Sequence, residues 1–255
     1  MDYTKLMDFT GKVVFVSGSS RGIGEAIVRA FAANGADVIV SSRDQAVCDA
    51  VAESIRADGG KAAGKACHAG RMEDITAVFD WIKETYGRLD VLVNCGGTNP
   101  FYGNIGETPE AAFDKTIDVN LKGPFYLSAK AVEMMQGQGG GAIVNVASIN
   151  GIKPGHLQGV YSMTKSAMIN MTQAFAREYG KDKIRVNAIC PGFIDTKMTA
   201  VFTANDKLVD QYTSSFPIQR VGKPEDMVGG VLYLASDAAG FTTGTTLTMD
   251  GGHLA

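Results

Sequence analysis

The sequence lacks several features that would each place it in a broad class. No run of apolar residues reaches the length of about 18 that a membrane-spanning helix requires. The first residues, MDYTKLMDFTGK, contain Asp2, Lys5 and Asp8 and no apolar core of a signal peptide. The net charge of −3 provides neither a basic surface for nucleic acid nor a cationic face for anionic lipid. We therefore expect a cytoplasmic protein without nucleic-acid or membrane partners.

Cysteine and histidine are scarce and scattered. The four cysteines lie far apart and form no Cys-x-x-Cys pair. The three histidines, His68, His156 and His253, do not have the spacing of metal ligands. We expect reduced, mostly buried cysteines and no zinc site.

Short apolar segments alternate with amphipathic ones along the whole chain. Residues 12–17 and 37–41 are typical of buried strands, and residues 23–35 between them repeat apolar side chains at helical spacing. Further strands are expected at 61–67, 89–95, 141–148, 183–192 and 246–252, separated by helices at 46–60, 75–87, 109–135, 161–179 and 224–236. This alternation predicts an α/β protein with a doubly wound, Rossmann-type parallel sheet of about seven strands. Ligands of such sheets bind beyond the carboxyl ends of the strands.

The segment SGSSRGIG, residues 17–24, directly follows the first predicted strand and opens a helix. Its glycines let a pyrophosphate approach the backbone, and the free amides at the helix start face the anion. The order of strand, turn and helix indicates a dinucleotide phosphate site. The residues expected to contact the cofactor here are Gly18, Ser20, Arg21, Gly22, Ile23 and Gly24.

The end of the second predicted strand, IVSSRD, indicates which nicotinamide cofactor binds. A carboxylate here would select NAD, whereas basic groups suit the 2′-phosphate of NADP. Ser42 occupies the place of that acid, Arg43 follows it, and Arg21 could reach the same phosphate. Asp44 remains an alternative, either as the NAD-selecting acid or as the N-cap of the next helix. We expect NADP(H) to be preferred, with NAD(H) possible.

Polar residues follow the fourth and fifth predicted strands. Asn94 and Gly96 end the fourth strand and are expected to form a wall against the cofactor. Ser148 ends the fifth strand, and Tyr161 and Lys165 share one helix face at the i and i+4 positions. A nearby cation lowers a phenol pKa of about 10 by roughly 1–3 units, toward a value useful for proton transfer.

Together these motifs make the chain resemble the short-chain dehydrogenase/reductase family in its roughly 250-residue form. The resemblance covers the glycine turn, NCGG at 94–97, Ser148, Tyr161-x-x-x-Lys165, the pair Pro191-Gly192 and DGG at 250–252. A narrower similarity, to NADPH-dependent carbonyl reductases, comes from CHAGRMED and TNPFYG. The family usually has Asn-Ala-Gly where Cys95, Gly96 and Gly97 stand, and many relatives have an aspartate where His68 stands.

The resemblance implies a catalytic set of four residues. Tyr161 would be the acid in reduction and the base in oxidation, and Ser148 would orient the substrate oxygen. Lys165 would hold the nicotinamide ribose, and Asn120, inside the long helix, would hold a water that relays protons. Further cofactor contacts are expected from His68, Asn94, Gly96, Tyr161, Lys165, Pro191, Gly192, Ile194 and Thr196. The whole chain, 1–255, is then one dinucleotide-binding oxidoreductase domain, with a substrate lid within 193–218.

The candidate substrate pocket is mostly apolar or aromatic. Its expected lining residues are Phe101, Tyr102, Ile149, Asn150, His156, Leu157, Phe193 and Phe202. A neutral, mostly apolar ketone, aldehyde or secondary alcohol fits this lining, and the resemblance implies a homotetramer or homodimer.

Three other functions stay open. They are a 3-oxoacyl-(acyl-carrier-protein) reductase, an NAD-dependent alcohol, sugar or steroid dehydrogenase, and a non-catalytic nucleotide sensor. Residues 133–144 contain no Lys or Arg for an acidic carrier protein, which disfavours the first. The intact set Ser148, Tyr161 and Lys165 disfavours the sensor.

Overall fold

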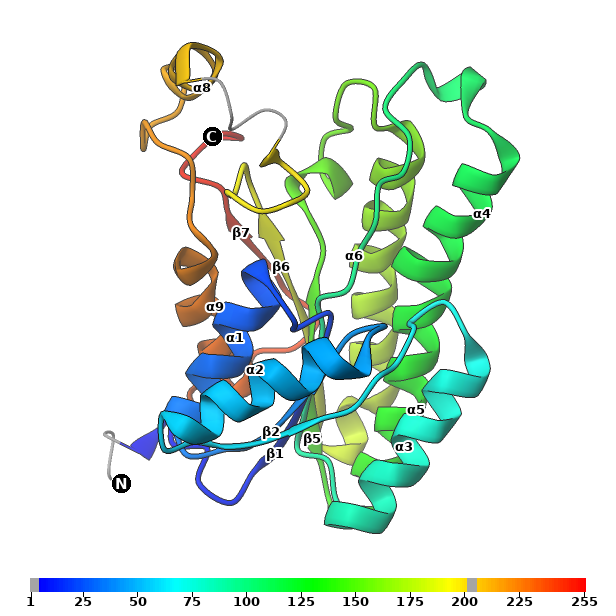
Figure 1. Ribbon diagram of the computed structural model, residues 1–255, viewed down its shortest axis with the longest axis vertical. Helices are drawn as coiled ribbons and strands as arrows, with labels where there is room; N and C mark the ends of the chain where they lie inside the picture. Colours follow the sequence, from blue (N-terminus) through cyan, green and yellow to red (C-terminus); the bar gives the residue numbers. More distant parts are fainter. Residues whose placement is uncertain (1–4, 201–205) are drawn as a thin grey trace.

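The computed structural model describes residues 5–200 and 206–255, with side chains from residue 209 onward in the second range. In these ranges seven parallel strands form one sheet in the order β3-β2-β1-β4-β5-β6-β7 (Figure 1). The strands are β1 Val13–Ser17, β2 Asp37–Ser41, β3 Lys61–Gly64, β4 Val91–Asn94, β5 Gly141–Val146, β6 Ile184–Pro191 and β7 Thr246–Met249. The predicted doubly wound sheet is confirmed.

Helices cover both faces of the sheet (Figure 1). One face packs against α1 (Gly22–Ala33), α2 (Gln45–Ala57) and α9 (Val228–Ala235). The other packs against α3 (Met72–Tyr86), α5 (Gly123–Gln138) and α6 (Gly159–Tyr179). Two further helices, α4 (Glu110–Ile117) and α8 (Asp206–Thr213), lie toward the carboxyl ends of the strands.

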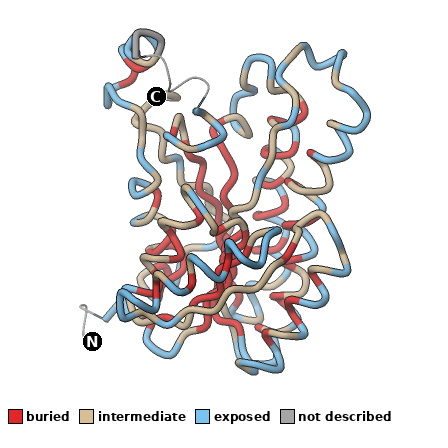
Figure 2. Tube along the Cα trace, viewed as in Figure 1, coloured by how far each residue is buried: buried red, intermediate tan, exposed pale blue. Residues whose placement is uncertain are grey.

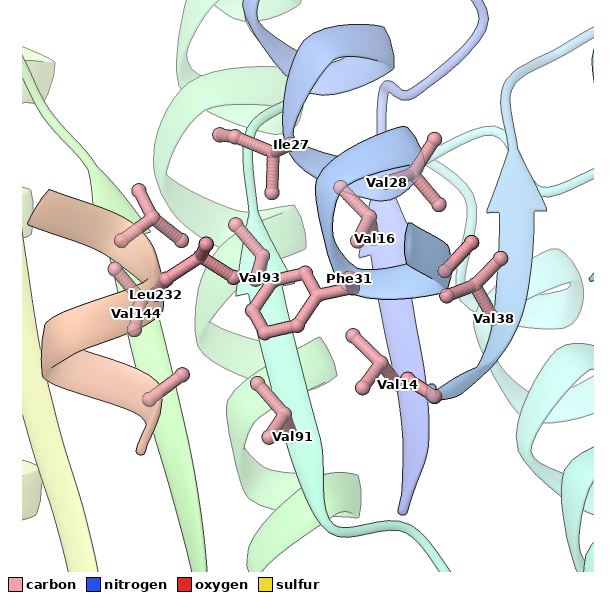
Figure 3. Packing of buried hydrophobic residues seen from close by; sticks show 14 of the residues in the cluster. Val14, Val16, Ile27, Val28, Phe31, Val38, Val91, Val93, Val144 and Leu232 are labelled. Atoms are coloured by element: carbon pink, nitrogen blue, oxygen red, sulfur yellow. The ribbon is translucent and has the colours of Figure 1, made fainter. Parts of the chain in front are cut away.

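The strands read as unbroken apolar runs because both of their faces are buried. Val14 and Val16 of β1 join the core cluster under α1, whereas Val13 and Phe15 join the cluster under α3 and α5. Phe31 of α1 is fully buried over the strands of the first face (Figure 3), where such burial contributes about 1.5–3 kcal/mol. Buried residues are accordingly concentrated in the sheet and on the inward sides of the helices (Figure 2).

The segment predicted as one helix over 109–135 is interrupted. Between α4 and α5, residues Asp118–Lys122 form a π-helical turn. Asn120 within it is fully buried and forms hydrogen bonds with the backbone of Thr98 rather than facing solvent. The prediction of one continuous α-helix is wrong at this turn, which presents Asn120 to a neighbouring loop. Such π-helical turns occur frequently at functional sites.

The strand order reverses between β1 and β4, which lie side by side. In sheets of this kind the crevice beyond the carboxyl ends of these strands is where ligands bind. The loops after β1, β4, β5 and β6 open there and contain most of the predicted site residues. The pocket candidate Phe202, and residues 201–205 of the predicted lid, lie outside the described residues. No helix in the described ranges is long and apolar enough to cross a membrane.

Candidate active site

The turn after β1 is shaped by a close approach of two loops. Gly18 has φ of +70°, and a Cβ added to it would lie 2.6 Å from Cα of Gly96. Only glycine fits both the left-handed backbone and this gap. Ser19 stabilises the turn, because its Oγ donates to Val16 O at 2.6 Å and accepts from Ser41 N at 2.9 Å.

The start of α1 faces the crevice with its first amides available. Arg21 occupies the N-cap position and gives no side-chain cap, so the amides that follow it are open to an anion. The position of a Gly22 Cβ would be 3.6 Å from Cγ2 of Thr196, which lies in the loop after β6. The β1 turn, with Ser20, Ile23 and Gly24, and the β6 loop therefore border one space. These features fit the phosphates of a dinucleotide.

The two arginines expected to bind a 2′-phosphate lie at the surface, Arg21 in the turn after β1 and Arg43 after β2. Arg21 and Arg43 are exposed, and neither forms an ion pair within the described ranges. Ser42 Oγ lies 3.2 Å from Cys48 Sγ, so its hydroxyl already has a partner. Asp44 is the N-cap of α2 and accepts from Val47 N at 3.3 Å. The carboxylate of Asp44 therefore caps α2, which is one of the two roles that the sequence left open.

His68 and Asn94 differ in how their side chains are used. His68 lies half-buried beyond β3, and its Nδ1 accepts from Gly70 N at 3.1 Å. Asn94 is 1% exposed, and its amide nitrogen donates inward to Asn145 Oδ1 at 2.8 Å and to Ser128 Oγ at 3.0 Å. The amide nitrogen of Asn94 therefore holds β4 to β5 and α5, whereas its Oδ1 is buried without a hydrogen-bond partner among the described residues. The cofactor contact expected of Asn94 stays a prediction.

Ser148, Tyr161 and Lys165 come together where β5 meets α6. Lys165 is 3% exposed, its Nζ donates to Val146 O at 2.8 Å, and it lies 5.6 Å from the centroid of the Tyr161 ring. Ser148 Oγ accepts from Asn150 N at 3.1 Å, and Ser148 lies close enough to Tyr161 to influence the pKa of its phenol. Helical spacing of Tyr161 and Lys165 thus produces the predicted cluster.

The protonation of this cluster differs from expectation. Burial raises the pKa of Tyr161 to about 12, and the nearby Ser148 side chain only partly opposes this. Burial also lowers the pKa of Lys165 to about 8, although the nearby thiols of Cys95 and Cys190 act in the other direction. We expected a nearby cation to lower the pKa of Tyr161, whereas in the protein alone the desolvation of the phenol is the larger effect.

Asn120 is engaged with one loop through both ends of its amide. Its Oδ1 accepts from Thr98 N, and its Nδ2 donates to Thr98 O, each at 2.8 Å. Nδ2 also lies 3.4 Å from Thr164 Oγ1, next to Lys165 in sequence. A Cβ on Gly97 would be 3.7 Å from Asn120 Oδ1 and 3.8 Å from Lys165 Nζ. Asn120 therefore joins the loop after β4 to the cluster of Ser148, Tyr161 and Lys165.

The loop after β6 contains the remaining predicted cofactor contacts. Pro191 ends β6, and Gly192 N donates to Met249 O at 3.0 Å. Ile194 is 4% exposed, its side chain belongs to the core, and its carbonyl accepts from Thr199 Oγ1 at 2.6 Å. Thr196 is half-buried and its amide donates to Thr199 Oγ1 at 2.9 Å.

Three side-chain amides, those of Asn99, Asn150 and Gln158, form a hydrogen-bonded group near Ser148 and Tyr161 that was not predicted from the sequence. Gln158 Oε1 accepts from Asn150 Nδ2 at 3.2 Å and from Asn99 Nδ2 at 3.3 Å. Asn150 is two residues from Ser148, and Gln158 is three before Tyr161. The short distance in sequence between Gln158 and Tyr161 could have identified Gln158 as a candidate site residue. Of the predicted apolar lining, Ile149 is buried and Phe101 and Phe193 are half-buried, whereas Tyr102, His156 and Leu157 are exposed.

Comparison with known proteins agrees with this arrangement. The profile of a family described as enoyl-(acyl carrier protein) reductase matches residues 18–253. An uncharacterized oxidoreductase of Thermotoga maritima is 41% identical over 253 residues, covering 98% of this chain and all of that protein. Human dehydrogenase/reductase SDR family member 4 is 34% identical over 249 residues, covering 98% of this chain and 90% of that protein.

The chain belongs to the short-chain dehydrogenase/reductase family. A short-chain type dehydrogenase/reductase from Mycobacterium marinum has the same fold, with a TM-score of 0.92 at 31% identity and 98% coverage of both chains. A Beutenbergia cavernae protein, provisionally named an NAD(P)-dependent gluconate 5-dehydrogenase and solved with bound NADP, gives a TM-score of 0.93 at 32% identity, over 98% of this chain and 99% of that one. As a member of this family the chain is an NAD(P)-dependent oxidoreductase that acts on CH–OH groups.

Proposed function

We propose that the chain transfers a hydride between NADP(H) and an uncharged ketone or aldehyde, or the corresponding alcohol, with Tyr161 as the general acid and base. The observation that carries this proposal is the convergence of Ser148, Tyr161 and Lys165 at the carboxyl end of β5. The nicotinamide cofactor supplies the hydride when bound.

Each residue of the cluster has one task in this proposal. Tyr161 donates its phenolic proton to the carbonyl oxygen in reduction and recovers it from the alcohol in oxidation. Ser148 Oγ donates a hydrogen bond to the same oxygen and fixes its position. Lys165 keeps a positive charge beside the Tyr161 ring, which favours loss of the phenolic proton. Asn120 holds the Thr98 loop against this cluster.

The preference for NADP(H) rests on the exit of β2. Arg21 in the glycine turn and Arg43 after β2 are both exposed, and two guanidinium groups suit a 2′-phosphate. The use of Asp44 as the N-cap of α2 supports this reading over NAD selection. The remaining cofactor contacts would come from the turn at Gly18–Gly24, from His68 and Gly96, and from the β6 loop.

The substrate is proposed to be uncharged, with an apolar body and a hydrogen-bonding group near the carbonyl. Phe101, Tyr102 and Phe193 supply the apolar wall. The amides of Asn99, Asn150 and Gln158 supply neutral donors and acceptors beside Ser148 and Tyr161. An acyl thioester is a second candidate, because the matching family profile has an acyl-carrier-protein description.

We further propose a homo-oligomer in the cytoplasm. Ile105, Ile152 and Met163 are 58%, 50% and 50% exposed and border one cavity of about 490 Å³ against α6. Such a contiguous apolar surface suits a second copy of the chain. The four cysteines are free thiols, which suits a reducing compartment. Light scattering coupled to size exclusion tests the oligomer.

The activity is tested by following nicotinamide absorbance while NADPH and NADH are each combined with plain ketones, hydroxyketones, aldehydes and 3-oxoacyl thioesters. Faster NADPH turnover on uncharged carbonyls is the expected result. Turnover confined to thioesters would assign the chain to the acyl-carrier alternative. Cofactor binding without turnover of any carbonyl or alcohol would contradict the proposed catalysis.

A further inference from the structure

Residues 250–254, here called the 250–254 tail, pack against the segment that follows β6. The His253 ring lies 4.5 Å from the Phe216 ring and 5.6 Å from the Tyr212 ring, measured between centroids. Tyr212 in turn lies 5.2 Å from the ring of Phe193. These four rings form a continuous aromatic series from the tail, through the end of α8, to the loop after β6. Figure 1 shows the C-terminus beside α8.

The tail has a defined shape of its own. Both carboxylate oxygens of Asp250 accept backbone amides, from Gly252 and from Leu254, each at 2.9 Å. Ile218 N donates to Gly251 O at 2.9 Å, which ties the tail to the segment after α8. Gly252 has φ of +84°, and a Cβ there would lie 2.6 Å from Pro217. The tail is therefore held in place independently of the His253 ring.

The same tail contacts the loop that borders the predicted nicotinamide site. A Cβ on Gly192 would lie 2.7 Å from Cα of Asp250, so the exits of β6 and β7 touch. Phe193 follows Gly192 directly and is half-buried, and Phe216 is 3% exposed. Tyr212 is 47% exposed and contacts three rings, those of Phe193, Phe216 and His253. Its position thus depends on the rings that flank it.

We propose that the 250–254 tail sets the position of the Phe193 wall of the carbonyl pocket, with His253 as a positioning residue that acts through Phe216 and Tyr212. This inference rests on the proposed function for the identity of the pocket. Without the His253 ring, Tyr212 loses one of its supports and Phe193 is less firmly held. The tail then determines how well a bulky carbonyl substrate is held, whereas hydride and proton transfer stay with Ser148, Tyr161 and Lys165.

The test compares the full-length protein with His253→Ala, His253→Phe and a deletion of Ala255, which is exposed and has no part in the aromatic series. KM and kcat are measured for a small and a bulky aryl ketone, with KM for the cofactor alongside. His253→Ala should raise KM for the bulky ketone by roughly two- to tenfold, the range expected from losing one aromatic contact. KM for the small ketone, kcat for both ketones and KM for the cofactor should stay within about twofold of wild type. His253→Phe should restore the wild-type KM for the bulky ketone.

A second readout does not depend on turnover. Limited proteolysis within residues 206–218 should be faster for His253→Ala than for wild type, His253→Phe or the Ala255 deletion. Equal cleavage rates would overturn the proposal, and so would faster cleavage with an unchanged KM for the bulky ketone. A wild-type protein that turns over no carbonyl would instead contradict the proposed function, while the cleavage rates would still decide whether His253 holds α8.

Discussion

Asn120 and Thr98 form a two-way hydrogen-bonded pair in which the side-chain amide of Asn120 matches the backbone of Thr98. Oδ1 accepts from the Thr98 N–H and Nδ2 donates to the Thr98 carbonyl, each at 2.8 Å. The pair closes the loop after β4 over the π-helical turn that contains Asn120. Both polar atoms of this amide therefore form structural hydrogen bonds beside the cluster of Ser148, Tyr161 and Lys165.

Replacing Asn120 by Leu should destabilise the fold and slow turnover. Both backbone groups of Thr98, which is half-buried, would lose their partner, and an unsatisfied polar group costs about 1–3 kcal/mol when it is fully buried. We expect a loss of about 1–3 kcal/mol in the free energy of unfolding, measured by urea titration, together with a lower kcat. Asn120→Asp retains the acceptor for Thr98 N but sets a carboxylate oxygen against the Thr98 carbonyl at a fully buried site, so it should not restore stability. Equal stability of the Leu variant and wild type would contradict the role of the pair.

Replacing Tyr161 by Phe should abolish most turnover while leaving cofactor binding intact. The ring and its packing are kept, and only the proton donor is removed. General acid catalysis of this kind contributes about 10²–10⁴-fold, which sets the expected loss in kcat. Tyr233→Phe is a matched control, because its hydroxyl lies 3.0 Å from Thr242 Oγ1 outside the site. Comparable kcat in the two variants would remove Tyr161 from the chemistry.

Replacing Arg43 by Ala should weaken NADPH use and leave NADH use nearly unchanged. A charge-assisted hydrogen bond is worth about 1.5–3 kcal/mol, so kcat/KM with NADPH should fall roughly 10- to 100-fold. Arg177→Ala, an exposed arginine near the end of α6, is the control. An equal loss with both cofactors would indicate a structural role, and a wild-type preference for NADH would return the assignment to Asp44.

Much of the fold could be predicted because it depends on residues that are close together in the sequence. The strands are buried on both faces and are therefore unbroken apolar runs, and the glycine turn lies between a strand and a helix. Ser148, Tyr161 and Lys165 could be grouped because one strand end and one helix face place them. In each case neighbouring residues contain the information.

What could not be predicted depends on contacts between distant residues. Asn120 and Thr98 are 22 positions apart. The spacing of apolar residues does not show that a side-chain amide in a helix forms hydrogen bonds with the backbone of a distant loop. The inward direction of Asn94 follows from Asn145 and Ser128, which are 51 and 34 positions away. The raised pKa of Tyr161 is a consequence of burial, which spacing alone does not show. The contact of His253 with Tyr212 likewise exists only once β7 is in the sheet.

Two glycines of the β1 turn should respond differently to alanine. Both have positive φ, which costs a residue with a Cβ about 1–2 kcal/mol. At Gly18 the Cβ would also lie 2.6 Å from the backbone of Gly96, whereas at Gly22 it would lie 3.6 Å from Thr196. Overpacking adds roughly 1–3 kcal/mol, so Gly18→Ala should be clearly less stable than Gly22→Ala in cofactor-free urea titrations. Equal losses would mean that the Gly96 contact relaxes freely.

Because Lys165 is buried, the free energy of unfolding should depend on pH. This dependence should be absent from the Lys165→Met variant. Its pKa is about 8 in the folded chain, whereas the ordinary value is 10.5. Between these values the unfolded chain holds one more proton, so wild-type stability rises with pH. Relative to Lys165→Met, the rise should approach about 3 kcal/mol, since one pKa unit is worth about 1.4 kcal/mol.

Urea titrations of wild type and Lys165→Met from pH 7 to pH 10 measure this difference. Below pH 8 both states of Lys165 are charged and the two stability curves should run parallel. Tyr161, whose pKa burial raises to about 12, acts in the opposite direction above pH 10, but both proteins contain it and its effect cancels. Curves that stay parallel from pH 8 to 10 would show that Lys165 keeps an ordinary pKa. The charge beside Tyr161 would then persist throughout the range in which the enzyme is assayed.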